Sequence, residues 1–264
     1  MRPERHGERR GGDPPLEPQR GQGNAALTAT AAATVTAARF LSAHVRELTL
    51  LPEGGGAPVD FAPGQWLSLQ LPVGERPPLV RAYSLAAPAR PDGSLVLCFD
   101  RVEGGLGSGW LWEAEPGATA VTFTGPVGNF VLPEGDGPLV LLARYTGIVP
   151  FRAMLLAIDA GLAPKRPVRL VYGAPSAAEQ VYHDELTALA EHADWLEYHP
   201  LLLDSGQDEI AFLAERAESW LPFNPMACGV REFTKPVRDL LMERFGFERR
   251  AVKVENYNGP AAAR

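Results

Sequence analysis

The chain has 264 residues, 45% of them hydrophobic, and a formal net charge of −7. This length suits one large domain or two domains of about 100–150 residues each. The acidic balance argues against a nucleic-acid-binding protein, which usually carries a basic face. The two cysteines, Cys98 and Cys228, exclude a disulfide scaffold and an iron–sulfur cluster held by four thiolates of this chain. The scattered histidines form no ligand pattern, so we expect no metal site.

Residues 1–24 are rich in Arg, Gly and Pro and contain few large apolar side chains. Such a composition predicts a disordered tail, and it lacks the apolar segment of a secretion signal. No run of the chain reaches the about 18 apolar residues that predict a transmembrane helix. We therefore expect a cytoplasmic protein that binds neither membranes nor nucleic acid.

Residues 25–133 have the texture of a β domain. Short runs rich in Val, Leu, Thr and aromatic residues alternate with Gly/Pro turns, which predicts an antiparallel barrel or sandwich. The Ala/Thr-rich stretch at 25–38 is expected to lead into the first strand, and a short helix is expected near 107–113. The predicted strands are 38–51, 65–71, 80–85, 95–102 and 119–124.

The texture changes at the Gly/Pro-rich link 134–138, which we take as the domain boundary. From there to residue 264, apolar strand-like runs alternate with amphipathic helical segments, a pattern typical of a Rossmann-like domain with a parallel, five-stranded sheet. Ligands bind such sheets at the carboxyl ends of the strands. The predicted strands are 139–143, 168–172, 195–199, 226–228 and 251–255, and the predicted helices are 151–160, 178–193, 209–220 and 234–245.

Two short motifs in the β half could bind an anion. In Arg81-Ala82-Tyr83-Ser84, an Arg on a strand can make forked hydrogen bonds to a phosphate, and Tyr83 lies on the same face as Arg81. The Gly-rich segment 104–108 precedes a helix, where free backbone N–H groups and the helix dipole favour an anion. Taken alone, the first motif is more often an exposed strand and the second an ordinary glycine turn.

Four further motifs follow in the same chain: residues 125–130 (Gly-Pro-Val-Gly-Asn-Phe), 146–150 (Thr-Gly-Ile-Val-Pro), 228–229 (Cys-Gly) and 254–257 (Val-Glu-Asn-Tyr). In this order and spacing, the six motifs resemble those of the ferredoxin–NADP⁺ reductase family. The resemblance covers residues 31–257.

The resemblance implies an FAD-binding β-barrel followed by an NAD(P)-binding domain. The expected activity is that of an FAD-dependent NAD(P)H oxidoreductase, which takes hydride from a reduced nicotinamide. It would pass electrons to a protein carrier, such as ferredoxin or flavodoxin, or to a small acceptor.

The resemblance also assigns the FAD site. It implies that Arg81 binds the FAD pyrophosphate, that Tyr83 stacks on the isoalloxazine next to Ala82, and that Ser84 faces flavin N5. The backbone N–H groups and one hydroxyl of the glycine loop would complete the pyrophosphate site. The loop residues concerned are Gly105, Leu106, Gly107 and Ser108.

For the nicotinamide, the resemblance implies that Thr146 and Gly147 line its path and that Cys228 lies beside its C4 atom. Glu255 would take part in a proton and charge relay, and Tyr257 would cover the flavin face. From the residues alone, Cys228 could equally be a small buried hydrophobe, and Glu255 an exposed strand end.

The loop that precedes Thr146 departs from the family pattern. Arg144 and Tyr145 stand where the family usually has two glycines, which let a dinucleotide approach the backbone. The loop could take another path, one of the two side chains could contact the ligand, or the nicotinamide site could be weakened. The departure raises the alternative of a flavin-binding electron-transfer subunit of a larger complex, with weakened or lost nicotinamide activity.

The choice between NADH and NADPH depends on residues 198–205. This stretch contains no Arg for a 2′-phosphate, and Asp204 would repel one, so the sequence favours NADH. Tyr182 resembles the residue that stacks on the adenine, although it could equally be a helix residue that packs on the sheet.

Overall fold

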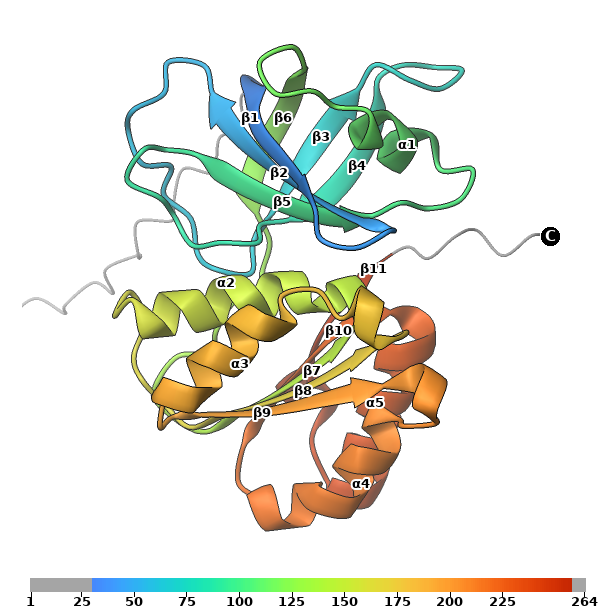
Figure 1. Cartoon of the computed structure of the whole chain (residues 1–264). Helices are drawn as coiled ribbons and strands as arrows, with labels where there is room; N and C mark the ends of the chain where they lie inside the picture. Colours follow the sequence, from blue (N-terminus) through green and yellow to red (C-terminus); the bar gives the residue numbers. More distant parts are fainter. Residues whose placement is uncertain (1–29, 258–264) are drawn as a thin grey trace, which may run out of the picture.

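A computed structural model describes residues 30–257 of the chain. The first half forms a six-stranded antiparallel sheet in the order β4-β3-β6-β1-β2-β5 (Figure 1). A bridge between Leu85 and Leu97 joins the two edges of the sheet and closes it into a barrel. The strands are β1 (Ala31–Phe40), β2 (Val45–Pro52), β3 (Trp66–Leu71), β4 (Leu79–Ser84), β5 (Leu95–Asp100) and β6 (Ala120–Val127).

Alternating apolar residues fill the barrel. In β3, Leu67, Leu69 and Leu71 are buried while the residues between them are only partly covered, as expected for a strand whose successive side chains point to opposite faces. The short helix α1 (Leu106–Trp112) packs against the barrel through Leu111.

The prediction of a single strand over 38–51 is wrong. Residues 31–40, which include the later part of the Ala/Thr stretch, form a separate strand, β1, and a turn at 41–44 connects it to β2. In this turn the Ser42 hydroxyl accepts hydrogen bonds from the backbone N–H groups of His44 and Val45, at 3.1 and 3.0 Å. A bulge between Val35 and Ala37 shifts the register of β1 and disturbs the apolar alternation that would reveal the strand.

The second half is a parallel sheet of five strands in the order β11-β10-β7-β8-β9. Its helices are α2 (Ile148–Asp159), α3 (His183–His192), α4 (Glu209–Trp220) and α5 (Arg231–Phe245). Its strands are β7 (Leu139–Arg144), β8 (Val168–Ala174), β9 (Leu196–Leu202), β10 (Asn224–Val230) and β11 (Lys253–Tyr257). Helices α2 and α3 cover one face and α4 and α5 the other (Figure 1). The predicted fold, an antiparallel barrel followed by a five-stranded parallel α/β domain, is confirmed.

Several predicted boundaries need correction. The helix predicted over 178–193 begins only at His183, because a 3₁₀ turn (Ala177–Glu179) comes first and Tyr182 adopts a left-handed conformation with φ 62°. Helix α2 begins before the predicted 151, and Pro150 fits its first turn because no intrahelical N–H bond is needed there. Helix α5 likewise begins before 234. The last strand starts after a 3₁₀ turn at Arg249–Ala251.

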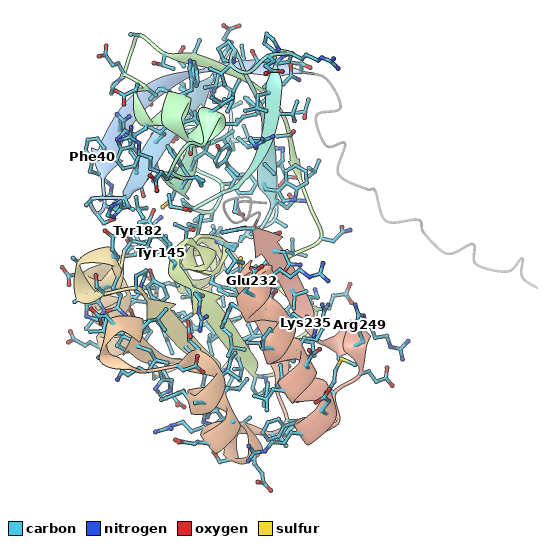
Figure 2. The ribbon with its side chains drawn as sticks, turned by 90° about the vertical axis from the view of Figure 1, so that its right-hand side faces the viewer. Phe40, Tyr145, Tyr182, Glu232, Lys235 and Arg249 are labelled. Atoms are coloured by element: carbon cyan, nitrogen blue, oxygen red, sulfur yellow. The ribbon has the colours of Figure 1, made fainter. Side chains whose placement is uncertain are left out.

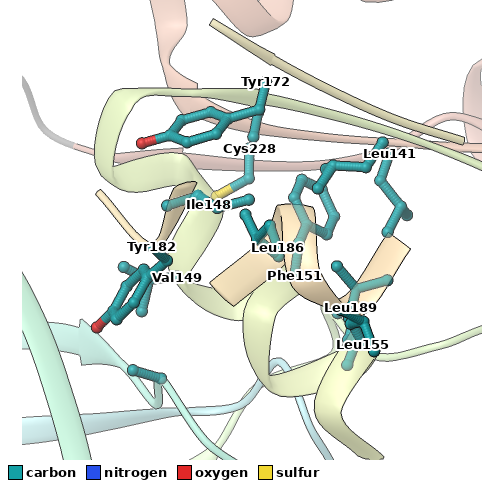
Figure 3. Packing of buried hydrophobic residues seen from close by; sticks show 14 of the residues in the cluster. Leu141, Ile148, Val149, Phe151, Leu155, Tyr172, Tyr182, Leu186, Leu189 and Cys228 are labelled. Carbon is teal, nitrogen blue, oxygen red and sulfur yellow. The ribbon is translucent and has the colours of Figure 1, made fainter. Parts of the chain in front are cut away.

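One of the apolar clusters contains buried residues of both domains. Helix α2 lies between the barrel and the parallel sheet in Figure 1, and its residues Ile148, Val149 and Phe151 pack in the cluster drawn in Figure 3. The same cluster includes Val45 and Val96 of the barrel. The link 134–138 lies between β6 and β7, and the predicted tail 1–24 lies outside the described residues. No helix within residues 30–257 is long and apolar enough to cross a membrane.

Candidate active site

Strand β4 exposes Arg81 at the edge of the barrel sheet. The residues Val80, Arg81 and Ala82 are all exposed, although neighbours along a strand point to opposite faces. Among the described residues, the Arg81 guanidinium donates only to the carbonyl of Val80, at 2.8 Å. Most of its five N–H donors are therefore available to an anion such as a phosphate.

The glycine loop lies directly beside Arg81. A Cβ atom on Gly107 would lie 3.3 Å from Arg81 Cγ and 3.1 Å from Leu71 Cδ1, so the start of α1 packs closely against the side chains of β3 and β4. The Ser108 hydroxyl is engaged inside the loop, where it accepts from the Val102 N–H at 3.1 Å. The backbone N–H groups of the first turn of α1 are therefore the donors that remain for a phosphate.

A groove of about 680 Å³ runs along this loop. It is lined by residues 104–106 together with His44, Arg101 and Trp110. Its volume lies in the usual range for small-molecule sites, about 300–1,000 Å³. The glycine loop lines this groove but Arg81 does not; the N–H groups of the loop and the exposed Arg81 guanidinium beside it could bind the phosphates of a dinucleotide such as FAD.

Tyr83 provides an aromatic surface next to these groups. It lies on the same side of β4 as Arg81 and makes an edge-on contact with Phe99, with 5.7 Å between ring centroids. Burial raises the pKa of Tyr83 to about 12. Its phenol is therefore neutral at physiological pH.

All four predicted catalytic residues meet where the barrel touches the parallel sheet. At the end of β4, the Ser84 hydroxyl donates to Glu255 Oε1 at 3.0 Å and accepts from the Tyr257 hydroxyl at 3.2 Å. Cys228 of β10 is fully buried and pairs in register with Glu255 of β11. The fold thus brings residues from three strands and both domains together, and we call this group the Ser84 cluster.

Burial controls protonation in the Ser84 cluster. It raises the pKa of Glu255 to about 7, against the opposing effect of the hydrogen bond from Ser84. Burial also raises the pKa of the Cys228 thiol well above its usual range, with a further contribution from the nearby Glu255 charge. Glu255 can therefore exchange a proton near neutral pH, whereas Cys228 stays a neutral thiol.

We expect Glu255→Gln to stabilise the protein at pH 8 relative to pH 5. The folded-state pKa of Glu255 lies above its ordinary value of 4.5, so the wild-type loses stability as pH rises from about 4.5 to about 7 and the buried carboxyl ionises. Glutamine removes this loss. Urea unfolding at both pH values measures it, with the exposed Glu191→Gln as control. An equal effect of Glu255→Gln at both pH values would contradict the prediction.

The turn at the end of β7 carries Arg144, which is held by two carboxylates. Arg144 Nε donates to Glu209 Oε1 at 3.0 Å, while Nη2 contacts Glu209 Oε2 and Asp208 Oδ2, the latter at 3.3 Å. Glu209 is fully buried at the start of α4, and the guanidinium also lies 4.6 Å from the centre of the Phe233 ring. Arg144 therefore compensates a buried negative charge.

Tyr145 turns toward the barrel. Its backbone is left-handed, with φ 51°, and its hydroxyl donates to Glu179 Oε2 at 2.7 Å. Glu179 also accepts from the Ser42 hydroxyl at 2.6 Å and contacts His44 Nδ1 at 2.8 Å. In Figure 2 Tyr145 lies near the boundary between the two domains. One carboxylate thus links the turn to the barrel.

Thr146 and Gly147 lie beside the Ser84 cluster. The Thr146 hydroxyl donates to Asp100 Oδ1 of the barrel at 2.9 Å. A Cβ atom on Gly147 would lie 2.1 Å from the carbonyl oxygen of Cys228. Glycine is thus required at 147 by the close approach of the turn to β10, whether or not a ligand binds there.

The structure does not bring Tyr182 to the other predicted site residues. Its side chain is only 8% exposed, its hydroxyl donates to Glu47 Oε2 at 2.7 Å, and the Arg152 guanidinium lies 4.3 Å from its ring centre. Arg152 in turn bonds to Glu185 and to the carbonyl of Ala86. Tyr182 therefore belongs to the contact between the domains, and we assign it no place in the nucleotide site.

The polar contacts between the domains were not predicted. Asp100 with Thr146, Glu179 with Ser42, and Glu47 with Tyr182 join residues far apart in sequence. No local spacing or motif signals such pairs. Only the folded arrangement reveals them.

Comparison with known proteins identifies the family of the chain. Residues 32–132 match the family model described as the oxidoreductase FAD-binding domain. The ferredoxin–NADP reductase B of Sorangium cellulosum is 35% identical over 246 residues, which cover 86% of this chain and 97% of that protein. The chain belongs to the ferredoxin–NADP⁺ reductase family. It is accordingly an FAD-dependent NAD(P)H oxidoreductase.

Other relatives match smaller or larger parts of the chain. The toluate 1,2-dioxygenase electron transfer component of Pseudomonas putida is 37% identical over 130 residues, but the match covers only 37% of that protein and 49% of this chain. Among solved structures, the Amycolatopsis cytochrome P450 reductase GcoB gives a TM-score of 0.74 at 29% identity, covering 89% of this chain and 71% of that one. Both of these relatives are longer than the segment that matches this chain.

Proposed function

We propose that this ferredoxin–NADP⁺ reductase family member takes hydride from NADH, in preference to NADPH, at the Ser84 cluster and passes electrons singly to a protein carrier. The observation that carries the proposal is the convergence of Ser84 with Glu255 and Tyr257 across the domain contact. Reduction of a flavin by a nicotinamide requires both rings to meet at such a contact.

Different residues would hold different parts of the cofactor. Arg81 and the backbone N–H groups after Gly105 would bind the pyrophosphate, and Tyr83 would support the ring system. When bound, FAD supplies hydride acceptance and release of single electrons. Ser84 and Tyr257 would orient the reacting face, and the buried surroundings of Cys228 would exclude water.

Glu255 is the proposed proton-carrying group. Its pKa of about 7 suits exchange of protons at physiological pH. The hydroxyl of Ser84 connects it to Tyr257. This chain of hydrogen bonds gives a proton a path along the interface of the two domains.

We expect kcat/KM for NADH to exceed that for NADPH by about tenfold, or about 1.4 kcal/mol of transition-state binding. Carboxylates dominate the carboxyl ends of β8 and β9: Asp204 follows β9, and Asp208 precedes α4 with its side chain 45% exposed. Arg144 is already paired with Glu209. Steady-state kinetics with both donors check this. Asp204→Ala should narrow the preference, and a preference for NADPH would contradict the assignment.

The proposed activity is tested by anaerobic titration of the FAD-loaded protein with NADH and, separately, NADPH. Loss of the oxidised flavin absorbance, near about 450 nm for bound flavins, would support it and show the faster donor. A flavin spectrum that neither nucleotide bleaches would contradict the nicotinamide donor. Failure to bind FAD at all would contradict the cofactor site.

A protein carrier is the proposed acceptor. The Pseudomonas putida relative is an electron transfer component, and the 264 residues contain only two cysteines, Cys98 and Cys228, so these residues cannot hold a four-thiolate cluster themselves. A second candidate is an electron-transfer subunit of a larger complex with weakened nicotinamide activity. The engaged side chains of Arg144 and Tyr145 favour it. Stable co-purification with a partner and slow reduction by NADH would support this candidate.

A further inference from the structure

The path of a dinucleotide crosses the end of β7. Ligands of open α/β sheets lie outside the carboxyl ends of the strands, where the strand order reverses. Here the reversal lies between β10 and β7, and Cys228 marks it beside the Ser84 cluster. A nucleotide that reaches from Cys228 toward β8 and β9 must pass over the turn that carries Arg144 and Tyr145. This step rests on the proposed function.

The side chains of that turn extend in two directions across the end of β8. Tyr145 reaches Glu179, which follows β8, and through it the barrel residues Ser42 and His44. Arg144 reaches Glu209, at the start of α4 after β9. Two side-chain bridges thus span the region where the nucleotide would lie.

Glu209 also occupies the backbone surface of β8. A Cβ atom on Gly173 would lie 1.9 Å from Glu209 Oε1, so the space over this glycine is filled by a carboxylate of the chain itself. Arg144 holds that carboxylate in place. We call Arg144 and Glu209 the fixed wall of the nucleotide path. Arg144 is expected to keep its position, because its departure would leave Glu209 buried and unpaired.

The Tyr145 bridge can open at lower cost. When the Tyr145 hydroxyl leaves, Glu179 keeps its contacts with Ser42 and His44. The left-handed backbone of Tyr145, with φ 51°, is unfavourable for a residue with a side chain. Both features favour movement of Tyr145 over movement of Arg144.

We propose that Tyr145 is a closing residue of the nicotinamide site, which must leave Glu179 before the dinucleotide can lie along the edge of the sheet, while Arg144 and Glu209 form the fixed wall of the path. Tyr145 then sets the affinity for the donor. It contributes no group to the reaction.

Tyr145→Gly tests this assignment. Glycine suits the left-handed backbone and removes the bond to Glu179. The variant therefore does not have to open the turn before it binds the dinucleotide. An open state populated to about 10% or less would lower the apparent affinity about tenfold or more. We expect the dissociation constant of NAD⁺, measured by calorimetry on the FAD-loaded protein, to fall by about that factor. Tyr145→Phe, which loses only the hydroxyl bond to Glu179, should give a smaller gain.

Ser219→Ala is the control. Its hydroxyl donates to the carbonyl of Arg216 at 2.8 Å near the exposed end of α4, outside the predicted site residues, so this variant should bind NAD⁺ as the wild-type does. If NADH reduces the wild-type flavin but Tyr145→Gly binds NAD⁺ no more tightly, the closing role is wrong and the proposed function stands. If NAD⁺ binds neither protein and NADH bleaches neither flavin, both are wrong.

Discussion

Arg81→Ala is expected to lose FAD during purification, with a dissociation constant raised about 100-fold or more. Hydrogen bonds to charged groups contribute about 1.5–3 kcal/mol each, and an Arg can make two of them to one phosphate. In the protein, Arg81 contacts only the carbonyl of Val80 among the described residues. The substitution should therefore lower the affinity for FAD without lowering the stability of the apoprotein.

Flavin absorbance after gel filtration and fluorescence titration of the apoprotein with FAD measure this effect. Arg81→Lys should fall between wild-type and Arg81→Ala, because lysine keeps the charge but loses the planar fork. Arg90→Ala, in the loop between β4 and β5, is the control for loss of a positive charge from the barrel. Wild-type affinity in Arg81→Ala would remove this residue from the FAD site.

The resemblance to the reductase family, carried by short motifs at strand ends, implied the members of the Ser84 cluster. Strand order explains why Cys228 and Glu255 lie opposite each other on adjacent parallel strands. Ser84 ends β4 of the barrel, and only the packing of the two domains brings it to them. What the motifs could not supply was the protonation of Glu255, since its pKa depends on burial by both domains.

The failures have a shared physical origin in contacts between distant segments. Tyr182 has an unfavourable left-handed backbone, yet its hydroxyl reaches Glu47, 135 residues away. The predicted helix begins only after this position, and the long-range contact of Tyr182 is one that no local propensity encodes. Likewise, the bulge at Val35 and Ala37 hid β1, because a shift of one residue moves every later side chain to the opposite face.

For Arg144, the sequence identifies an unusual residue but does not determine what its side chain contacts. The sequence shows a bulky residue where the family has glycine, and contact with a ligand was one of the possible outcomes. The structure instead pairs Arg144 with Glu209, 65 residues further along the chain. Gly173 leaves room for that carboxylate. Arg144, Glu209 and Gly173 therefore depend on one another for charge and space.

This dependence predicts that Arg144→Ala destabilises the protein by about 3–5 kcal/mol, the usual cost of leaving one member of a buried ion pair uncompensated. Glu209 is fully buried, and the neighbouring Asp208, itself a carboxylate, cannot neutralise its charge. Arg144 itself is 24% exposed, which places the effect toward the lower end of that range. Urea unfolding at neutral pH measures the change in the free energy of unfolding.

Adding Glu209→Gln to Arg144→Ala separates charge from packing. The double variant has no buried charge at this point, so it should recover most of the lost stability, and the coupling between the two positions gives the strength of the pair. The exposed pair of Lys235 and Asp239 on α5 is the comparison (Figure 2 shows Lys235), because surface pairs contribute at most about 1 kcal/mol. An effect of Arg144→Ala no larger than that of Lys235→Ala would mean that Glu209 is not held by Arg144. The path beside β8 would then lack the fixed wall that makes Tyr145 its movable side.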